Sequence, residues 1–366
     1  MILSQLIEGA LKLGASDIHL MQEAPPYMRI DGTIFPVKHP PLSLGNLQEL
    51  VKEIVPEHLM EKLESKRGID TGYQYKNLVR CRVIVFFERR RINIVMRLIP
   101  VNIPTIEELE LPLILKKIAE YDRGLVLVTG PAGSGKSTTL AAMVNHINNN
   151  KKISIITIED PIEFSYENKK GIISQRQVGD DVENFTIGVR QALRQDPDVL
   201  LIGEMRDAET MRTALSVAET GLLIFSTLHT TSAIQTVERI ISNFPESEHD
   251  LIREMLSYNL KAVLTQNLIK RIEGKGRIAA MEVLVVTKTV SKLIMDNRIS
   301  DIFEVMKSRD EGMQIFDQSF AGLVLEKKIS EDVGTKASRD VYAYRRFLQG
   351  VQSWSDRGGI IGGFMS

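Results

Sequence analysis

The spacing of apolar residues divides the chain into two parts with different patterns. Up to residue 99, apolar positions at helical spacing over 1–14 and 46–65 are mixed with segments in which apolar and polar residues alternate. The strands predicted from that alternation are 16–20, 27–30, 33–35, 79–88 and 92–99. The tight-turn dipeptide Asp31-Gly32 predicts a hairpin between two of them. Helices beside an antiparallel sheet indicate a small α+β domain over residues 1–99.

From residue 113 onward, strands alternate with helices. The predicted strands are short, almost purely apolar runs at 124–129, 153–158, 198–203 and 222–227, and the helices between them are 136–149, 184–195 and 207–219. Such runs are typical of a parallel sheet covered on both faces, whose ligand site lies at the carboxyl ends of the strands. Further on, the pattern predicts helices at 246–268, 288–307, 312–326 and 338–348, interrupted by a strand pair around Gly274-Lys275-Gly276.

Two stretches carry no strong period. Residues 100–112 contain Pro100, Pro104 and Pro112, which predicts an extended, semi-rigid linker and a hinge if the two domains move. Residues 113–350 then form the second domain. The glycine-rich stretch 351–366 is expected to be a disordered tail.

Composition excludes several classes of protein. The 366 residues are 43% apolar and 25% charged with a net charge of −1, which argues against a nucleic-acid or membrane-surface role for a whole domain. Arg89-Arg90-Arg91 is accordingly interpreted as a solvated hairpin turn. The one cysteine, Cys81, excludes an internal disulfide and a cysteine-based zinc cluster. Without a leader pattern or a run of about 18 apolar residues, we expect a cytoplasmic protein that meets the membrane only through partners.

One glycine-rich segment fits the P-loop pattern that binds nucleoside triphosphates. It follows the apolar strand 124–129 and consists of Gly130, Pro131, Ala132, Gly133, Ser134, Gly135, Lys136 and Ser137. Backbone N–H groups of such a loop surround phosphate oxygens, and the positive end of the next helix, with Thr138 in its first turn, adds to the anion site. Lys136 is expected to reach the β- and γ-phosphates, and the Ser137 hydroxyl to hold Mg²⁺. The sequence therefore predicts binding of ATP with Mg²⁺.

Charged and polar residues follow three strands of the predicted core. Glu204 follows strand 198–203, Glu163 follows strand 153–158, and His229 follows strand 222–227. Phosphoryl transfer to water needs a metal, a group that orients the water, and positive charge near the transition state. Glu204 suits water activation or metal organisation, and His229 suits a contact with the γ-phosphate.

Simpler interpretations remain open for these residues. Acidic residues at strand ends are often helix caps, which applies to Glu163 and to Asp207. A histidine on a loop is often structural or solvated. Convergence on neighbouring strand ends beside a P-loop favours the functional interpretation.

Five segments together resemble a known family. Residues 193–207 resemble the signature of the secretion-superfamily ATPases, with Gly203 where a Walker B strand usually ends in Asp. Residues 157–164 and 226–233 resemble the Asp box and His box of that superfamily. Residues 14–20 and 97–100 resemble the N-terminal domain of the type IV pilus retraction ATPases, PilT and PilU, and the resemblance extends over about residues 1–330.

This resemblance implies a homohexameric ring motor. Each subunit would combine a small PAS-like α+β N-terminal domain with a RecA-like P-loop α/β ATPase domain that carries C-terminal helices, and ATP would sit between the two domains. The implied roles are the Walker B glutamate for Glu204, the Asp-box glutamate for Glu163, the His-box histidine for His229, and arginines that approach the phosphates for Arg82 and Arg97. Glu204 and Glu163 join Ser137 as metal candidates, and Arg194 and Arg206 are candidates for nucleotide binding.

The implied activity is ATP hydrolysis that drives pilus retraction and twitching motility. The implied partners are an inner-membrane pilus platform protein and a paralogous retraction ATPase. Two departures matter: residues 289–296 differ from a PilT motif linked to retraction, and Leu222 replaces a usual histidine, which would slow hydrolysis. Residues 312–318 resemble PilU more closely, so we favour a PilT/PilU-like paralogue.

Two other functions remain as alternatives. A P-loop kinase acting on a small molecule would need an arginine-rich lid, which does not follow the P-loop fold. A RecA-like motor acting on nucleic acid is disfavoured by the net charge of −1.

Overall fold

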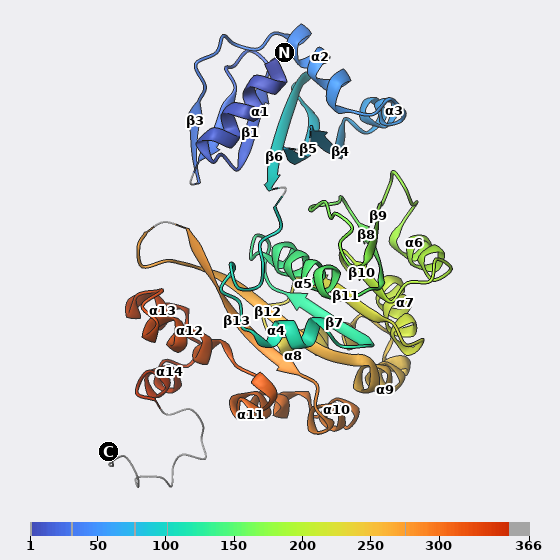
Figure 1. Cartoon of the computed structure of the whole chain (residues 1–366), viewed down its shortest axis with the longest axis vertical. Coiled ribbons are helices and arrows are strands. Elements are labelled where there is room, and N and C mark those ends of the chain that lie inside the picture. Colours follow the sequence, from blue (N-terminus) through green and yellow to red (C-terminus); the bar gives the residue numbers. More distant parts are fainter. Residues whose placement is uncertain (1, 31, 77, 101, 275, 351–366) are drawn as a thin grey trace. The chain divides into compact units, whose positions relative to one another are not determined.

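The computed structural model describes residues 2–30, 32–76, 78–100, 102–274 and 276–350. It contains two compact units (Figure 1). The first unit comprises the chain up to Ile103 together with the segment Pro161–Tyr166. The second comprises Pro104–Asp160 and the chain from Glu167 onward.

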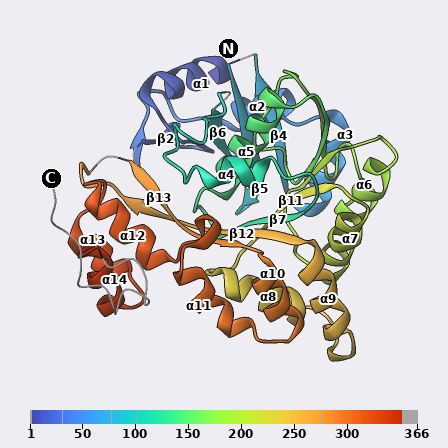
Figure 2. The same ribbon diagram turned by 60° about the horizontal axis from the view of Figure 1, so that its bottom comes forward.

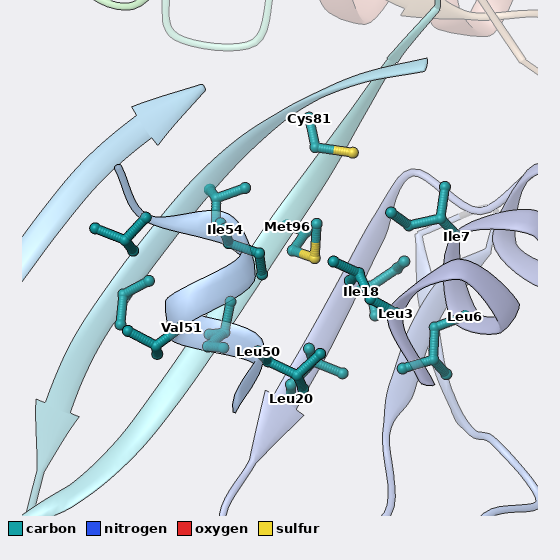
Figure 3. Close-up of a cluster of buried hydrophobic side chains, with 14 of the residues drawn as sticks. Leu3, Leu6, Ile7, Ile18, Leu20, Leu50, Val51, Ile54, Cys81 and Met96 are labelled. Carbon is teal, nitrogen blue, oxygen red and sulfur yellow. The ribbon is translucent and has the colours of Figure 1, made fainter. Parts of the chain in front are cut away.

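The first unit is an antiparallel sheet with helices packed on it. Its elements are α1 (Ile2–Leu13), β1 (Asp17–Met21), β2 (Tyr27–Ile30), β3 (Thr33–Pro36), α2 (Leu44–Ile54), α3 (Glu57–Lys66), β4 (Gly68–Tyr75), β5 (Val79–Glu88) and β6 (Arg91–Pro100). The strand order is β3-β2-β1-β6-β5-β4, with every pair antiparallel. Figure 3 shows Leu3 and Ile7 of α1 and Leu50 and Ile54 of α2 gathered with Met96 in one buried cluster. This confirms the predicted α+β class.

Two features of the first unit differ from the prediction. The single helix expected over 46–65 is two helices, because Pro56 forces Val55 into extended backbone and ends α2 at Ile54. Strand β4 was not predicted, since its sequence is rich in polar residues and glycine. Asp31 of the expected hairpin turn lies outside the described residues.

The second unit is a mostly parallel α/β sheet. Its central strands and helices are α4 (Ile114–Ala119), β7 (Gly124–Thr129), α5 (Lys136–Asn150), β8 (Ser154–Glu159), β9 (Ile172–Gln177), α6 (Phe185–Ala192), β10 (Val199–Ile202), α7 (Ala208–Glu219), β11 (Leu223–Leu228) and α8 (Ala233–Ser242). Then follow α9 (His249–Asn259), β12 (Leu260–Lys270), β13 (Arg277–Val285), α10 (Lys288–Met295), α11 (Ile302–Lys307), α12 (Phe316–Leu325), α13 (Glu331–Ala337) and α14 (Val341–Leu348). Short 3₁₀ turns lie at Glu246–Glu248, Ile299–Asp301 and Asp310–Gly312.

The strand order of this sheet is β13-β12-β7-β11-β10-β8-β9. All neighbours are parallel except the β12–β13 pair. Helix α5 lies on one face of the sheet and α8 and α9 on the other (Figure 2). Both faces of the central strands are therefore covered, which explains why β7, β10 and β11 are buried along their whole length. The predicted α/β class is confirmed.

Helix prediction fails over residues 260–268. The helix expected over 246–268 ends at Asn259, and the chain continues as strand β12. A long apolar run does not distinguish helix from strand by itself, and β12 is fixed by pairing with β7 and β13 on its two sides. Strand β9 and helices α4, α8 and α13 were not predicted either.

Residues 104–112, expected to be extended, form hydrogen-bonded turns instead. Ile106 and Leu111 are buried, and the N–H of Leu111 donates to the carbonyl of Ile106 at 3.0 Å. Glu110 forms ion pairs with Arg271 and Lys328. Hydrogen bonds from Lys328 and Arg271 lower the pKa of Glu110, so the stretch is anchored by charge as well as by burial.

No helix in the described part of the chain is long and apolar enough to cross a membrane. The stretch 351–366, expected to be a disordered tail, lies outside the described residues.

Cys81 offers a direct measure of how often the first unit opens. It is buried in the β5 interior, and burial raises its pKa to about 12. Because the thiolate is the reactive form, the folded protein should resist alkylation at pH 8 and react only on opening, when the pKa returns to about 8.5. Leu3→Ala removes a fully buried side chain and should destabilise this unit by about 3 kcal/mol, so that labelling becomes roughly 100-fold faster.

The matched control is Leu11→Ala on the same helix. Leu11 is 39% exposed, so its labelling rate should stay within a few-fold of wild type. Equal acceleration by both variants would contradict the assignment of Leu3 to the core of this unit.

Candidate active site

The P-loop connects the end of β7 to the start of α5. Gly130 has φ of 142°, and a Cβ there would come within 2.3 Å of the Gln266 carbonyl oxygen. Gly135, the N-cap of α5, has φ of 89° and would place a Cβ 2.8 Å from Gln266 Nε2. Only glycine satisfies both the positive φ and these close approaches. The loop is therefore held in one shape by its neighbour β12.

Gln266 is a residue of this site that sequence reasoning missed. It lies buried on β12, its Nε2 donates to the Ser134 carbonyl at 2.8 Å, and its Oε1 accepts from Thr139 Oγ1 at 2.6 Å. One side chain thus ties the loop to the first turn of α5. No motif indicates it, because its role depends on the pairing of β12 beside β7.

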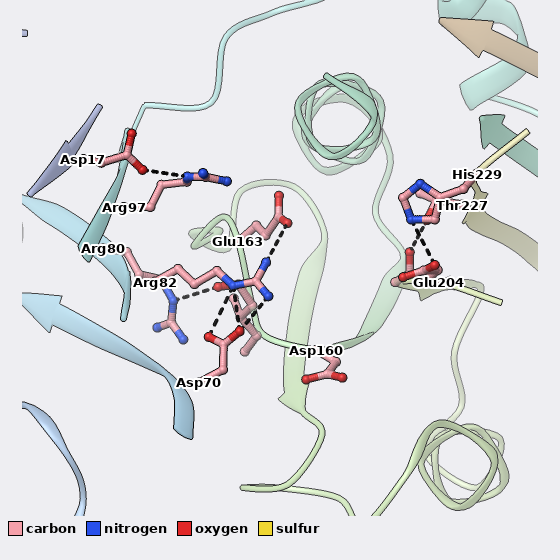
Figure 4. A network of polar contacts seen from close by, with 12 residues as sticks. Asp17, Asp70, Arg80, Arg82, Arg97, Asp160, Glu163, Glu204, Thr227 and His229 are labelled. Atoms are coloured by element: carbon pink, nitrogen blue, oxygen red, sulfur yellow. Dashed lines mark hydrogen bonds and ion pairs between the residues drawn. The ribbon is translucent and has the colours of Figure 1, made fainter. Parts of the chain in front are cut away.

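Lys136, His229 and Glu204 come together in the second unit. The Lys136 ammonium donates to the carbonyls of Gly130 and Pro131 at 2.9 and 3.1 Å, and lies 3.3 Å from His229 Nδ1. The other ring nitrogen, Nε2, lies 3.1 Å from Glu204 Oε1 (Figure 4). The imidazole therefore bridges the P-loop lysine and the glutamate at the end of β10.

Strand register explains this meeting. Ile202 pairs with Ser226 across β10 and β11, so the residues that follow each strand emerge together. Thr227 Oγ1 donates to the Gly203 carbonyl at 2.7 Å and fixes the backbone just before Glu204. The side chain of Glu204 is 20% exposed, which leaves one edge of the carboxylate accessible from outside.

Arg206 and Asp207 have different functions beside this glutamate. Arg206 Nε donates to Glu204 Oε2 at 2.8 Å, and its guanidinium lies 3.8 Å from Asp160. Asp207 is the N-cap of α7 and accepts from Thr210 N–H at 2.8 Å, so the helix-cap interpretation of Asp207 is confirmed. Arg194 lies in the exposed turn between α6 and β10.

Arg82 and Arg97 are direct cross-strand partners in the first unit, on β5 and β6. Like charges placed opposite each other destabilise an antiparallel pair. Each arginine is paired with a carboxylate (Figure 4). Arg97 Nε donates to Asp17 Oδ1 at 3.1 Å. Arg82 donates to Asp70 Oδ2 from Nε at 3.0 Å and from Nη2 at 2.7 Å. Asp17 and Asp70 were not identified from the sequence.

The segment Pro161–Tyr166 contacts the same strand of the first unit. Arg80 Nε donates to the Ile162 carbonyl at 3.1 Å, and Glu163 lies 4.0 Å from Arg82. Arg80 and Arg82 alternate along β5, so their side chains share one face of the sheet. The Asp-box glutamate and one of the two predicted phosphate-binding arginines are thereby brought together within one unit.

The predicted residues thus fall into two groups. Lys136, His229, Glu204 and Arg206 meet in the second unit, and Arg82, Arg97 and Glu163 belong to the first. Among the residues described, no group of three or more histidine, cysteine, aspartate or glutamate side chains is arranged to hold a metal ion.

The P-loop fits a phosphate group. Gly130, Gly133 and Gly135 all have positive φ, and a Cβ at Gly133 would meet open space. The buried hydroxyl of Ser134 has no hydrogen-bond partner in the described part of the protein. A loop of positive-φ glycines with open space at Gly133 and an unpaired buried donor is suited to phosphate oxygens.

Comparison with known proteins identifies the family. The family model described as type II/IV secretion system protein matches residues 1–333. The chain belongs to this family. The Pseudomonas aeruginosa type IV pilus retraction ATPase PilT is 42% identical over 333 residues, covering 91% of this chain and 96% of PilT. The P. aeruginosa type IV pilus ATPase PilU is 40% identical over 327 residues, covering 89% and 86%.

A solved structure agrees with these relatives. The crystal structure of the pilus retraction motor PilT with bound ADP matches with a TM-score of 0.86 and 40% identity, covering 93% of this chain and 98% of that one. The chain is therefore a PilT/PilU-like secretion ATPase, as the motifs predicted.

Gln266→Ala should weaken nucleotide binding. The substitution removes the buried bonds to Ser134 and Thr139 and leaves the loop less ordered, so the affinity for ADP should fall about tenfold. Titration with a fluorescent ADP analogue measures this directly. Gln48→Ala, at an exposed position of α2, should bind like wild type; equal affinities for all three proteins would show that Gln266 does not organise the loop.

Proposed function

We propose that this chain hydrolyses ATP at the P-loop and uses that energy as a motor for type IV pilus retraction. The observation that carries the proposal is the Lys136–His229–Glu204 cluster. In it the P-loop lysine contacts one ring nitrogen of the histidine, and the glutamate carboxylate contacts the other. The relatives named for pilus retraction support the biological setting. Neither a kinase nor a nucleic-acid motor has comparable support.

In this proposal each predicted site residue of the second unit has a defined role. The P-loop amides and Lys136 bind the phosphates, while Arg194 and Arg206 provide further charge. Glu204 accepts a proton from the attacking water or orients it, and His229 contacts the γ-phosphate. When bound, Mg²⁺ neutralises charge that develops on the phosphates. It usually takes one or two protein ligands beside phosphate and water oxygens, for which we assign Ser137 and Glu204, with Glu163 as a further candidate.

Arg82 and Arg97 are proposed to deliver positive charge from the first unit. Their support is the side-by-side placement on β5 and β6 and the carboxylates that orient them. A guanidinium oriented by a carboxylate presents its N–H groups in a planar fork, and this geometry suits recognition of a phosphate. A change in the arrangement of the two units would then follow the state of the nucleotide.

The remaining parts of the proposal concern assembly. We propose a homohexamer that acts on a pilus platform protein at the cytoplasmic side of the inner membrane, beside a paralogous retraction ATPase. The identities of 42% to PilT and 40% to PilU support a place among the type IV pilus ATPases.

Glu204→Gln tests the chemistry. The amide keeps the shape of the side chain and cannot accept a proton, so Mg²⁺-dependent ATP turnover should fall by at least 100-fold while ADP affinity changes less than a few-fold. Steady-state phosphate release and ADP titration measure the two quantities. Glu64→Gln, an exposed position on α3, is the control and should keep full turnover. Undiminished hydrolysis by Glu204→Gln would refute the assignment.

Deleting the gene tests the biological role. Loss of a retraction motor should leave pili assembled, so cells should carry more surface pili than the parent and lose twitching motility. Complementation with the wild type, but not with Glu204→Gln, should restore both. Fewer pili in the deletion strain would point to extension instead of retraction.

A further inference from the structure

The turn that carries His229 is held by residues from the C-terminal part of the second unit. This turn, residues 229–232, connects β11 to α8. Ser232 caps α8 by accepting from Gln235 N–H at 3.1 Å, and the hydroxyls of Thr230 and Thr236 bond at 2.7 Å. These local contacts shape the turn. Two further contacts come from residues far away in the sequence.

The first is Glu282 on β13. Its side chain is buried with the residue 1% exposed, and its Oε1 accepts from the Ala233 N–H at 2.6 Å. Ala233 is the first residue of α8, where an unpaired N–H and the positive end of the helix favour an acceptor. Burial raises the pKa of Glu282, opposed by the Ala233 bond and by Arg339. An unsatisfied buried carboxylate would be costly, so this bond fixes the start of α8 firmly.

The second contact is Arg339, between α13 and α14. Its guanidinium donates to the Thr231 carbonyl at 2.6 Å, lies 3.8 Å from Glu282 Oε2, and covers the ring of Phe316 at 5.5 Å. Its backbone N–H donates to the buried carboxylate of Asp317 on α12 at 2.8 Å. Arg339 is therefore fixed at its backbone and at its side chain.

Together these residues hold the backbone at two points, two and four residues beyond His229. We propose that Glu282 and Arg339 are positioning residues that set the place of the His229 ring between Lys136 and Glu204. The inference rests on the proposed function, because it matters only if His229 acts in hydrolysis. It adds that the helices α12–α14 influence the ATP site through the Thr231 carbonyl.

Arg339→Ala is the main test, measured in the full-length protein. Loss of the guanidinium releases the turn, so the turnover number for ATP should fall about tenfold while the affinity for ADP, which the P-loop determines, stays within twofold of wild type. Arg298→Ala is the matched control. In the described part of the chain, this exposed arginine forms an ion pair with Asp301, three residues further on. The variant should keep wild-type turnover.

A double-mutant cycle separates positioning from a merely structural effect. If Arg339 acts through His229, Arg339→Ala should lower turnover in the wild-type background and change it less than twofold in the His229→Ala background. If the double variant loses turnover by the product of the two single-variant losses, the inference is overturned. So would a His229→Ala variant with full turnover, since there would then be no function to position.

Variants of Glu282 provide the conservative comparison. Glu282→Gln keeps an oxygen that accepts from Ala233 and should retain at least half of the wild-type turnover. Glu282→Ala removes it and should resemble Arg339→Ala; if it fails to fold, Arg339→Ala and Glu282→Gln still decide the question. A wild-type protein without ATPase activity refutes the proposed function, whereas an active wild type with an unaffected Arg339→Ala variant refutes this inference alone.

Discussion

The parallel hydrogen-bond ladder joining β7, β11 and β10 is the constraint on which the site depends. The strands pair so that Thr129 is opposite Leu228 and Ile202 is opposite Ser226. The P-loop, His229 and Glu204 each follow one of these strands by one to two residues. Because the polar groups follow these strands directly, the register of the ladder sets the distances between them.

A different balance of forces governs the arginine face of the first unit. Arg82 and Arg97 occupy opposed positions, where their charges repel, and Asp17 and Asp70 offset that repulsion on either side. The arrangement fixes two paired guanidinium groups on adjacent strands of one sheet. Paired and partly exposed charges of this kind contribute little to stability, which is consistent with a role in recognition.

The sequence allowed prediction of the site residues that lie in motifs. It did not allow prediction of those whose contacts depend on strand pairing and tertiary packing. Gly130 to Ser137, Glu204 and His229 stand at fixed offsets from apolar strands, so they could be predicted, and the structure places His229 between Lys136 and Glu204. Gln266, Glu282 and Arg339 lie in stretches without any motif. Their partners are determined by where β12, β13 and the segment after α13 lie in three dimensions. The strand pair predicted around Gly274 and Gly276 is confirmed by β12 and β13, but the helix predicted over 246–268 took in most of β12.

The segment Pro161–Tyr166, which belongs to the first unit, limits how the chain can be divided. The chain leaves that unit after Ile103, returns to it at Pro161, and leaves again after Tyr166. Phe164 is buried, and the Ile162 carbonyl accepts its hydrogen bond from Arg80. A fragment that begins at Pro104 would carry this six-residue return without Arg80, which donates to it from the first unit. The two units are therefore interleaved along the chain, and neither corresponds to a piece that a single cut would release intact.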